Sequence, residues 1–199
     1  ALPLDKITKH ARDQQFEALD PPAIPSLHRG QRQVAWSPPE APRYKINYDV
    51  ATFAKDGKVG LGVVIRNSEG LVMASLTQQI PLPTTVIETE ALAAWRATEF
   101  ALEIGLANII LEGDNETLFK ALKTGDNSLA QHGHIIKDIL VLSSYYSDFN
   151  VSFVRRQCNK LAHSLARKAK FLPSMIVWME EVPPDLVPIF EADMTSLPK

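Results

Sequence analysis

Cysteine is almost missing from this chain of 199 residues, because Cys158 is the only one. A single cysteine excludes an intramolecular disulfide framework and a cysteine-rich zinc site, and it suits a reducing compartment. Long apolar runs are missing too: no segment approaches the roughly 20 apolar residues of a membrane span, and no signal peptide opens the chain. We therefore expect an intracellular protein without a membrane partner. No compact basic run offers a nuclear import signal, so nucleus and cytoplasm both stay open.

Charge of one sign is not in large excess either. Lys and Arg number 21 against 23 Asp and Glu, which gives a formal net charge of −2. This balance neither announces nor excludes a nucleic-acid partner, because a local basic face matters more than the total. The chain is 45% hydrophobic and 22% charged, as in ordinary globular proteins, and it is long enough for one complete core. It has no internal repeat and no oligomerisation signal, so we expect a monomer.

The two ends of the chain differ from its middle. Residues 1–19 carry apolar side chains at roughly helical spacing, and prolines then crowd the stretch from Asp20 to Pro42. The predicted division is a helix and Pro-rich linker over 1–42, a compact domain over 43–171, and a C-terminal tail over 172–199. Trp178 is expected to anchor part of the tail. Because the first residue is Ala rather than Met, we expect a fragment, a processed product or an incomplete gene model.

The compact domain opens with three strands separated by turn residues, the pattern of an antiparallel meander. A long helix follows, and its start is predicted from a capping box of Thr85 and Glu88. The elements are predicted, in order, as strands 44–53, 59–66 and 71–79, helix 86–105, strand 109–113, helices to about 123 and over 131–144, strand 150–154, and a helix over 159–170 capped by Asn159. This order predicts an α/β fold with a mixed five-stranded sheet flanked by helices.

Three acidic residues occupy positions where a carboxylate is costly to bury. Asp49 lies within an apolar strand, Glu90 on the apolar stripe of the long helix, and Asp114 at the end of an apolar strand. Two of them have an ordinary explanation, because Glu90 favours the positive end of its helix and Asp114 would cap the next one. Asp49 is harder to explain, since Asp is depleted in strands. The predicted topology brings the three side by side, which indicates a divalent metal site.

Five stretches carry a resemblance to a known family: WSPPEAPRYKINYDVA, GLGVVIRNSEGLVMAS, ETEALAAWRATEFALEIGL, IILEGDNETLFKAL and VRRQCNKLAHSLAR. Over roughly residues 36–170 the chain resembles the ribonuclease H-type domain found across plants, which is related to the C-terminal ribonuclease H of non-LTR retrotransposon polyproteins. The resemblance implies a ribonuclease H-like fold in which Asp49, Glu90 and Asp114 hold two Mg²⁺ ions about 4 Å apart, with Mn²⁺ as a substitute. The implied reaction is endonucleolytic hydrolysis of the RNA strand of an RNA–DNA hybrid, recognised by its 2′-hydroxyls.

Two positions depart from the family pattern. His163, in NKLAHSLA, stands where active relatives carry a fourth carboxylate, and we place it in the catalytic set. Neutral imidazole is a poor ligand for Mg²⁺ and a better one for Mn²⁺. A protonated His163 would instead bind phosphate as a cation. The third interpretation is a residue on the polar face of the helix without a role in the site. Val50 stands where the family usually has a glycine that permits close backbone approach. These two departures leave open a catalytically weak nucleic-acid-binding module. The acidic net charge and the Pro-rich flanks leave open a protein-interaction scaffold.

Basic residues cluster late in the chain and predict a nucleic-acid face. On the last predicted helix, Lys160, His163 and Arg167 share one stripe. The residues assigned to nucleic-acid binding, with the help of the resemblance, are Ala51, Asn115, Arg155, Arg156, Asn159, Lys160 and Arg167. Such a run is also typical of a solvated helix face, and the two asparagines are also good helix caps.

Overall fold

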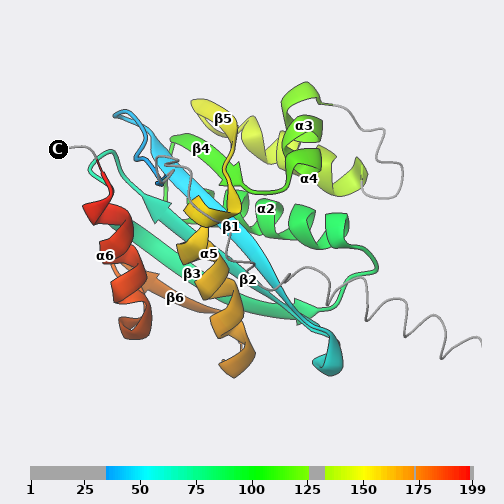
Figure 1. The fold of residues 1–199 in the computed structure, drawn as a ribbon. Coiled ribbons are helices and arrows are strands. Elements are labelled where there is room, and N and C mark those ends of the chain that lie inside the picture. The colour runs from blue at the N-terminus through cyan, green and yellow to red at the C-terminus, as the bar shows by residue number, and fades with distance from the viewer. Residues whose placement is uncertain (1–34, 126–132, 173, 198–199) are drawn as a thin grey trace, which may run out of the picture.

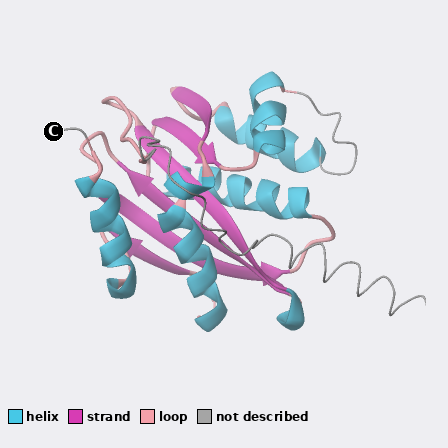
Figure 2. Ribbon diagram, in the orientation of Figure 1, coloured by secondary structure: helices cyan, strands magenta, loops and turns pink. Residues whose placement is uncertain are grey.

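The computed structural model describes residues 35–125, 133–172 and 174–197, which form a mixed sheet with helices on both faces (Figure 1, Figure 2). The strands are β1 (Tyr44–Phe53), β2 (Lys58–Arg66), β3 (Val72–Pro81), β4 (Asn108–Gly113), β5 (Asp148–Phe153) and β6 (Ile176–Met179), in the order β5-β4-β1-β2-β3-β6. The helices are α2 (Val86–Glu103), α3 (Glu116–Thr124), α4 (Gly133–Ser143), α5 (Lys160–Lys168) and α6 (Val187–Thr195). In this part of the chain no helix is both long and apolar enough to cross a membrane.

The expected α/β fold is confirmed, with six strands in place of five. The additional strand, β6, lies in the predicted C-terminal tail and pairs antiparallel with the outer edge of β3. Trp178, on this strand, packs against an apolar cluster between the sheet, α5 and the segment that leads into α6. A strand of four residues carries too little alternation to stand out in the sequence. The helix predicted over 1–19 lies outside the described residues.

The end of the predicted linker is part of the packed structure. Trp36 is only 2% exposed, and the guanidinium of Arg66 lies 3.4 Å from the centroid of its ring. Stacking of this kind joins the segment before β1 to the end of β2. The packed domain therefore reaches back at least to Trp36, beyond the boundary expected at Arg43.

The long helix α2 covers one face of the sheet. At its start Thr85 Oγ1 accepts a hydrogen bond from the Glu88 amide at 3.2 Å, and Glu88 Oε2 accepts one from the Thr84 amide at 3.0 Å. The cap therefore forms as predicted, with the return bond displaced by one residue. The helix buries an apolar stripe of alanines and one phenylalanine against the sheet: Ala93, Ala97, Phe100 and Ala101.

The other face of the sheet is covered by α5, which lies directly on β2. A Cβ atom built on Gly62 would lie 2.2 Å from the carbonyl oxygen of Ala162, and one on Gly60 would lie 2.1 Å from that of Ala166. Only glycine leaves room for this approach. Since Gly62 pairs with Asp49 of β1, the same contact brings the α5 side chains close to Asp49.

Candidate active site

Asp49 lies in the middle of β1, opposite Gly62, and is 4% exposed. Its Oδ1 accepts a hydrogen bond from the Val50 amide at 2.7 Å. Its buried Oδ2 has no hydrogen-bond partner among the described residues. An uncompensated buried carboxylate oxygen is costly, which indicates that this atom serves a ligand.

Glu90 reaches the same point from the second turn of α2, where it is 8% exposed. Burial raises the pKa of Glu90 well above its ordinary value; the nearby charges of Asp49 and Asp114 raise it further, and Arg156 opposes them. Within the described part of the chain its Oε2 atom is also buried without a hydrogen-bond partner. A helix-dipole role at the surface does not fit this environment, so the ordinary explanation for Glu90 is wrong.

Asp114 follows β4 directly and supplies the third carboxylate. It does not cap α3, because Asn115 does: Asn115 Oδ1 accepts a hydrogen bond from the Leu118 amide at 3.0 Å. The pKa of Asp114 is raised to about 6, first by burial and then by the charge of Asp49, while Arg156 and His163 act in the opposite direction. The capping explanation for Asp114 is therefore wrong as well.

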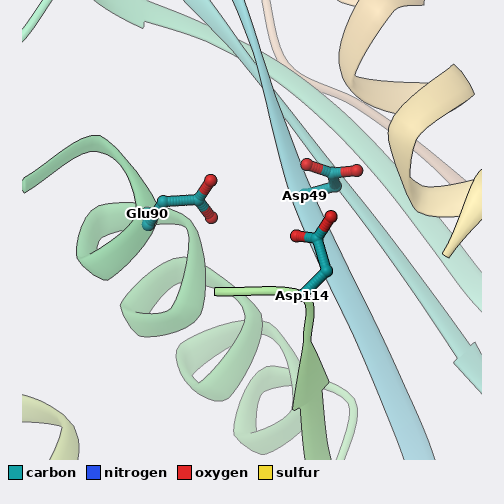
Figure 3. Close-up of side chains that lie close together, drawn as sticks. All are labelled: Asp49, Glu90 and Asp114. Atoms are coloured by element: carbon teal, nitrogen blue, oxygen red, sulfur yellow. The ribbon is translucent and has the colours of Figure 1, made fainter. Parts of the chain in front are cut away.

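The three carboxylates converge from β1, from α2 and from the residue directly after β4 (Figure 3). One ligand oxygen from each lies within 4.8 Å of those of the other two. The parallel strands β1 and β4 pair only as far as Asn47 and Glu112, so Asp49 and Asp114 come just beyond the last pair, where the strands separate. All-oxygen donors with two unpaired buried atoms are what a hard divalent cation such as Mg²⁺ or Mn²⁺ requires.

His163 completes the group from the α5 side. Its Nδ1 lies 3.2 Å from Asp49 Oδ2, and its side chain is 23% exposed. The residue therefore faces the carboxylates, and the interpretation as a plain solvated polar-face residue is wrong. Val50 is half-buried, packs against the core on the α2 side and also lines the cleft described next.

A cleft of about 620 Å³ opens from the carboxylates along α5. Asp49, Glu90 and Asp114 line it together with His163. The remaining lining includes the cations Arg156, Arg167, Lys168 and Lys170. Lys168 is held by Asp185 at 2.7 Å. The cleft therefore joins a centre of negative charge to a basic wall.

The sequence model of the family described as reverse transcriptase-like matches residues 47–169, more than half of the chain. The chain belongs to this family. A search of curated proteins finds no significant match. Among solved structures, RNase H1 from the halophilic archaeon Halobacterium salinarum aligns with a TM-score of 0.60 and 25% identity, covering 65% of this chain and 98% of that one.

Two further solved structures share the fold of this reverse transcriptase-like domain. The N-terminal RNase H domain of a Mycobacterium tuberculosis protein aligns with a TM-score of 0.55 and 20% identity, covering 64% of this chain and 92% of that one. LC11-RNase H1, solved in complex with an RNA/DNA hybrid, aligns with a TM-score of 0.53 and 19% identity, covering 63% and 95%. The fold of the reverse transcriptase-like domain is thus that of ribonuclease H.

Two of the asparagines assigned to nucleic acid have other partners in this reverse transcriptase-like domain. Asn159 is 1% exposed and donates from Nδ2 to the carbonyl oxygen of Tyr48 at 2.8 Å. Asn159 stands at the N-cap position of α5, as predicted, but in the described structure its side chain makes no capping bond. Its burial leaves little of the side chain accessible to a nucleic acid. The Oδ1 atom of Asn115 is used by the α3 cap.

The remaining assigned residues are better placed. Ala51 is nearly buried and lines the cleft, as do Arg156 and Arg167. Arg155 and Lys160 are exposed beside the start of α5. The sequence interpretation missed Phe171, an aromatic residue that is 81% exposed yet lines the basic part of the cleft. Its only sequence signal was its position directly after the basic stripe.

Proposed function

We propose that this reverse transcriptase-like protein is a divalent-metal-dependent endonuclease that hydrolyses the RNA strand of RNA–DNA hybrids. The observation that carries the proposal is the convergence of Asp49, Glu90 and Asp114 at the mouth of a basic cleft. The fold supports it, because the three solved structures described above are ribonucleases H or ribonuclease H domains.

The carboxylates are suited to bind two Mg²⁺ ions, with Mn²⁺ as a substitute. Asp49 and Glu90 each offer a buried oxygen that finds no hydrogen-bond donor in the described structure. Burial first, and then neighbouring negative charge, raise the pKa of Glu90 and of Asp114. Such mutual repulsion is relieved when cations bind. Bound divalent ions would activate a water for attack on the phosphodiester and neutralise charge on the leaving oxygen.

The basic wall of the cleft is suited to orient the substrate. Arg156 and Arg167 line the same cleft as the carboxylates, where they can contact backbone phosphates. Their charge also offsets the net negative charge of the protein where a polyanion must approach. Discrimination of the RNA strand would rest on its 2′-hydroxyls in the minor groove of the hybrid.

The decisive experiment uses an end-labelled RNA–DNA hybrid in Mg²⁺ and in Mn²⁺. Wild type is compared with Asp114→Asn, which keeps the shape of the side chain and removes its charge. We expect internal cleavage of the RNA strand by wild type and a loss of at least about 100-fold in the variant. Duplex DNA and duplex RNA of the same sequence are the substrate controls. Absence of hybrid cleavage in either metal, with circular dichroism showing an intact fold, would refute the nuclease.

One observation favours a second function, a nucleic-acid-binding module with weak or no turnover. His163 faces Asp49, and it stands where the resemblance to ribonucleases H implies a carboxylate. On this alternative the hybrid binds with strong salt dependence but is not cut. Fluorescence anisotropy at several salt concentrations, run beside the cleavage assay, separates the two functions, because only the nuclease releases shortened RNA.

A further inference from the structure

Two buried polar atoms face each other at the edge of the cluster formed by Asp49, Glu90 and Asp114. Asp49 Oδ2 and His163 Nδ1 lie 3.2 Å apart. Each is buried, and neither has a hydrogen-bond partner in the part of the chain that the structure describes. The pair is therefore close without having the geometry of a hydrogen bond, although both atoms need a polar contact.

The separation of the pair is that of two neighbouring ligands on one cation. Adjacent ligands of an octahedral ion with bonds of about 2.1 Å lie about 3.0 Å apart. An imidazole nitrogen and a carboxylate oxygen can each offer a lone pair to such an ion. The close approach of α5 to β2 at Gly62 fixes this arrangement, because the α5 backbone leaves no space for a side chain there.

We propose that His163 is a nitrogen ligand of the metal centre and that it makes the centre select Mn²⁺ over Mg²⁺. The inference rests on the metal site of the proposed function and specifies which ion that site takes. Mg²⁺ prefers oxygen ligands, whereas imidazole suits transition-metal ions, and affinity for a given nitrogen-containing site rises along the first-row series from Mn²⁺. An aspartate at position 163 would make the set all-oxygen and suited to Mg²⁺.

The test measures the metal ion directly and needs no nucleic acid. In pulsed electron paramagnetic resonance, a nitrogen bound to Mn²⁺ modulates the spin echo. We expect ¹⁴N modulation in the wild-type protein loaded with Mn²⁺, and loss of it in His163→Asp and in His163→Gln. His134→Gln, which replaces an exposed histidine of α4, is the matched control and keeps the signal.

Calorimetric titration with Mn²⁺ and with Mg²⁺ provides the second readout. The ratio of the two affinities should fall by about tenfold or more in His163→Asp, mainly through stronger Mg²⁺ binding, and should stay unchanged in His134→Gln. Circular dichroism and urea unfolding establish that each variant folds. His163→Gln keeps the test valid if the added charge of His163→Asp disturbs folding.

The inference and the proposed function fail in different ways. Hybrid cleavage in Mg²⁺ without ¹⁴N modulation would leave the nuclease intact and overturn the role of His163. Nitrogen modulation without cleavage would support His163 as a ligand and count against the nuclease. If Mn²⁺ does not bind, or binds with no nitrogen signal and an unaltered affinity ratio in His163→Asp, the inference is overturned.

Discussion

Asn159, the residue before α5, donates a hydrogen bond to the carbonyl oxygen of Tyr48, the residue before Asp49 in β1. The donor and acceptor atoms are 2.8 Å apart and buried. One turn beyond Asn159, His163 contacts Asp49. The bond therefore connects the start of α5 to the strand that carries the first carboxylate, and it stabilises the arrangement of the candidate site.

Replacing Asn159 by alanine should destabilise the protein by about 1–3 kcal/mol, because it removes a buried hydrogen bond and leaves an acceptor without its partner. Urea unfolding followed by circular dichroism measures the change. Asn150→Ala is the matched control, since Asn150 bonds Asp148 at an exposed site. The control should lose less than about 0.5 kcal/mol. Equal losses in the two variants would show that the Asn159 bond contributes nothing specific.

Gly62→Ala should be among the most damaging single-methyl additions in this chain. The new Cβ would lie 2.2 Å from the Ala162 carbonyl oxygen, so α5 must move away from the sheet. We expect a loss of about 3 kcal/mol or more, or failure to fold, measured by thermal unfolding. Gly57→Ala is the comparison: it has open space around it and a φ of 62°, so only backbone strain of about 1–2 kcal/mol applies. A milder effect at Gly62 than at Gly57 would contradict the packing of α5.

The C-terminal helix should be part of the folded domain through one buried ion pair. Arg66 Nη1 donates to Asp193 Oδ2 of α6 at 2.8 Å, and Arg66 Nη2 donates to Asn47 at 2.9 Å. Burial lowers the pKa of Arg66 to about 10, so it stays charged at neutral pH. Asp193→Ala leaves that charge buried and unpaired, which should cost about 3–5 kcal/mol. Asp185→Ala, which breaks the exposed pair with Lys168, should cost less than about 1 kcal/mol in the same urea titration.

The sequence predicts those parts of the molecule that depend on local periodicity. The bounds of β1 match the prediction, and the stripe on α2 places Glu90 toward the sheet as expected. The cluster of Asp49, Glu90 and Asp114 was predictable because the order of the strands and helices brings these three residues together. Contacts between distant segments were not predictable, since no local sequence pattern indicates that β6 pairs with β3 or that Trp36 stacks on Arg66.

Two contacts in the candidate site depend on packing that the sequence does not show. Asn159 has the residue type of a helix cap, and the sequence cannot show that its amide group bonds strand β1 instead. His163 was placed in the catalytic set with a polar-face residue as the alternative, and the close packing of α5 on Gly62 brings it to Asp49. In both cases tertiary contact outweighs the local preference.

Phe171 should contribute to hybrid binding as a stacking surface. It is 81% exposed and lines the cleft beside Arg167, so a base or sugar can lie against its ring. Phe171→Ala should weaken binding by about 5-fold to 100-fold, measured by anisotropy with a fluorescent hybrid in EDTA so that no cleavage occurs. Tyr145→Ala removes a ring that is 72% exposed and does not line the cleft, and it should leave the affinity unchanged. Equal effects of the two substitutions would mean that the cleft does not receive the hybrid.

Asp114→Asn should stabilise the metal-free protein at neutral pH. Burial and the charge of Asp49 raise the pKa of Asp114 from 3.8 to about 6, so the folded state holds this proton more tightly than the unfolded state does. Stability therefore falls as the pH rises from about 4 to about 6, and the cost persists above that range. Asp114→Asn lacks this cost, so its free energy of unfolding should exceed that of wild type by about 1–2 kcal/mol at pH 7.5 in EDTA, but by little at pH 4. Asp138→Asn, on the exposed side of α4, is the control in the same urea titrations and should change the stability by less than about 0.5 kcal/mol. With saturating Mn²⁺, wild type should become more stable than Asp114→Asn, because metal binding stabilises only the protein that keeps all three carboxylates. If Asp114→Asn is still the more stable protein at pH 7.5 with Mn²⁺ present, Asp114 is not a ligand.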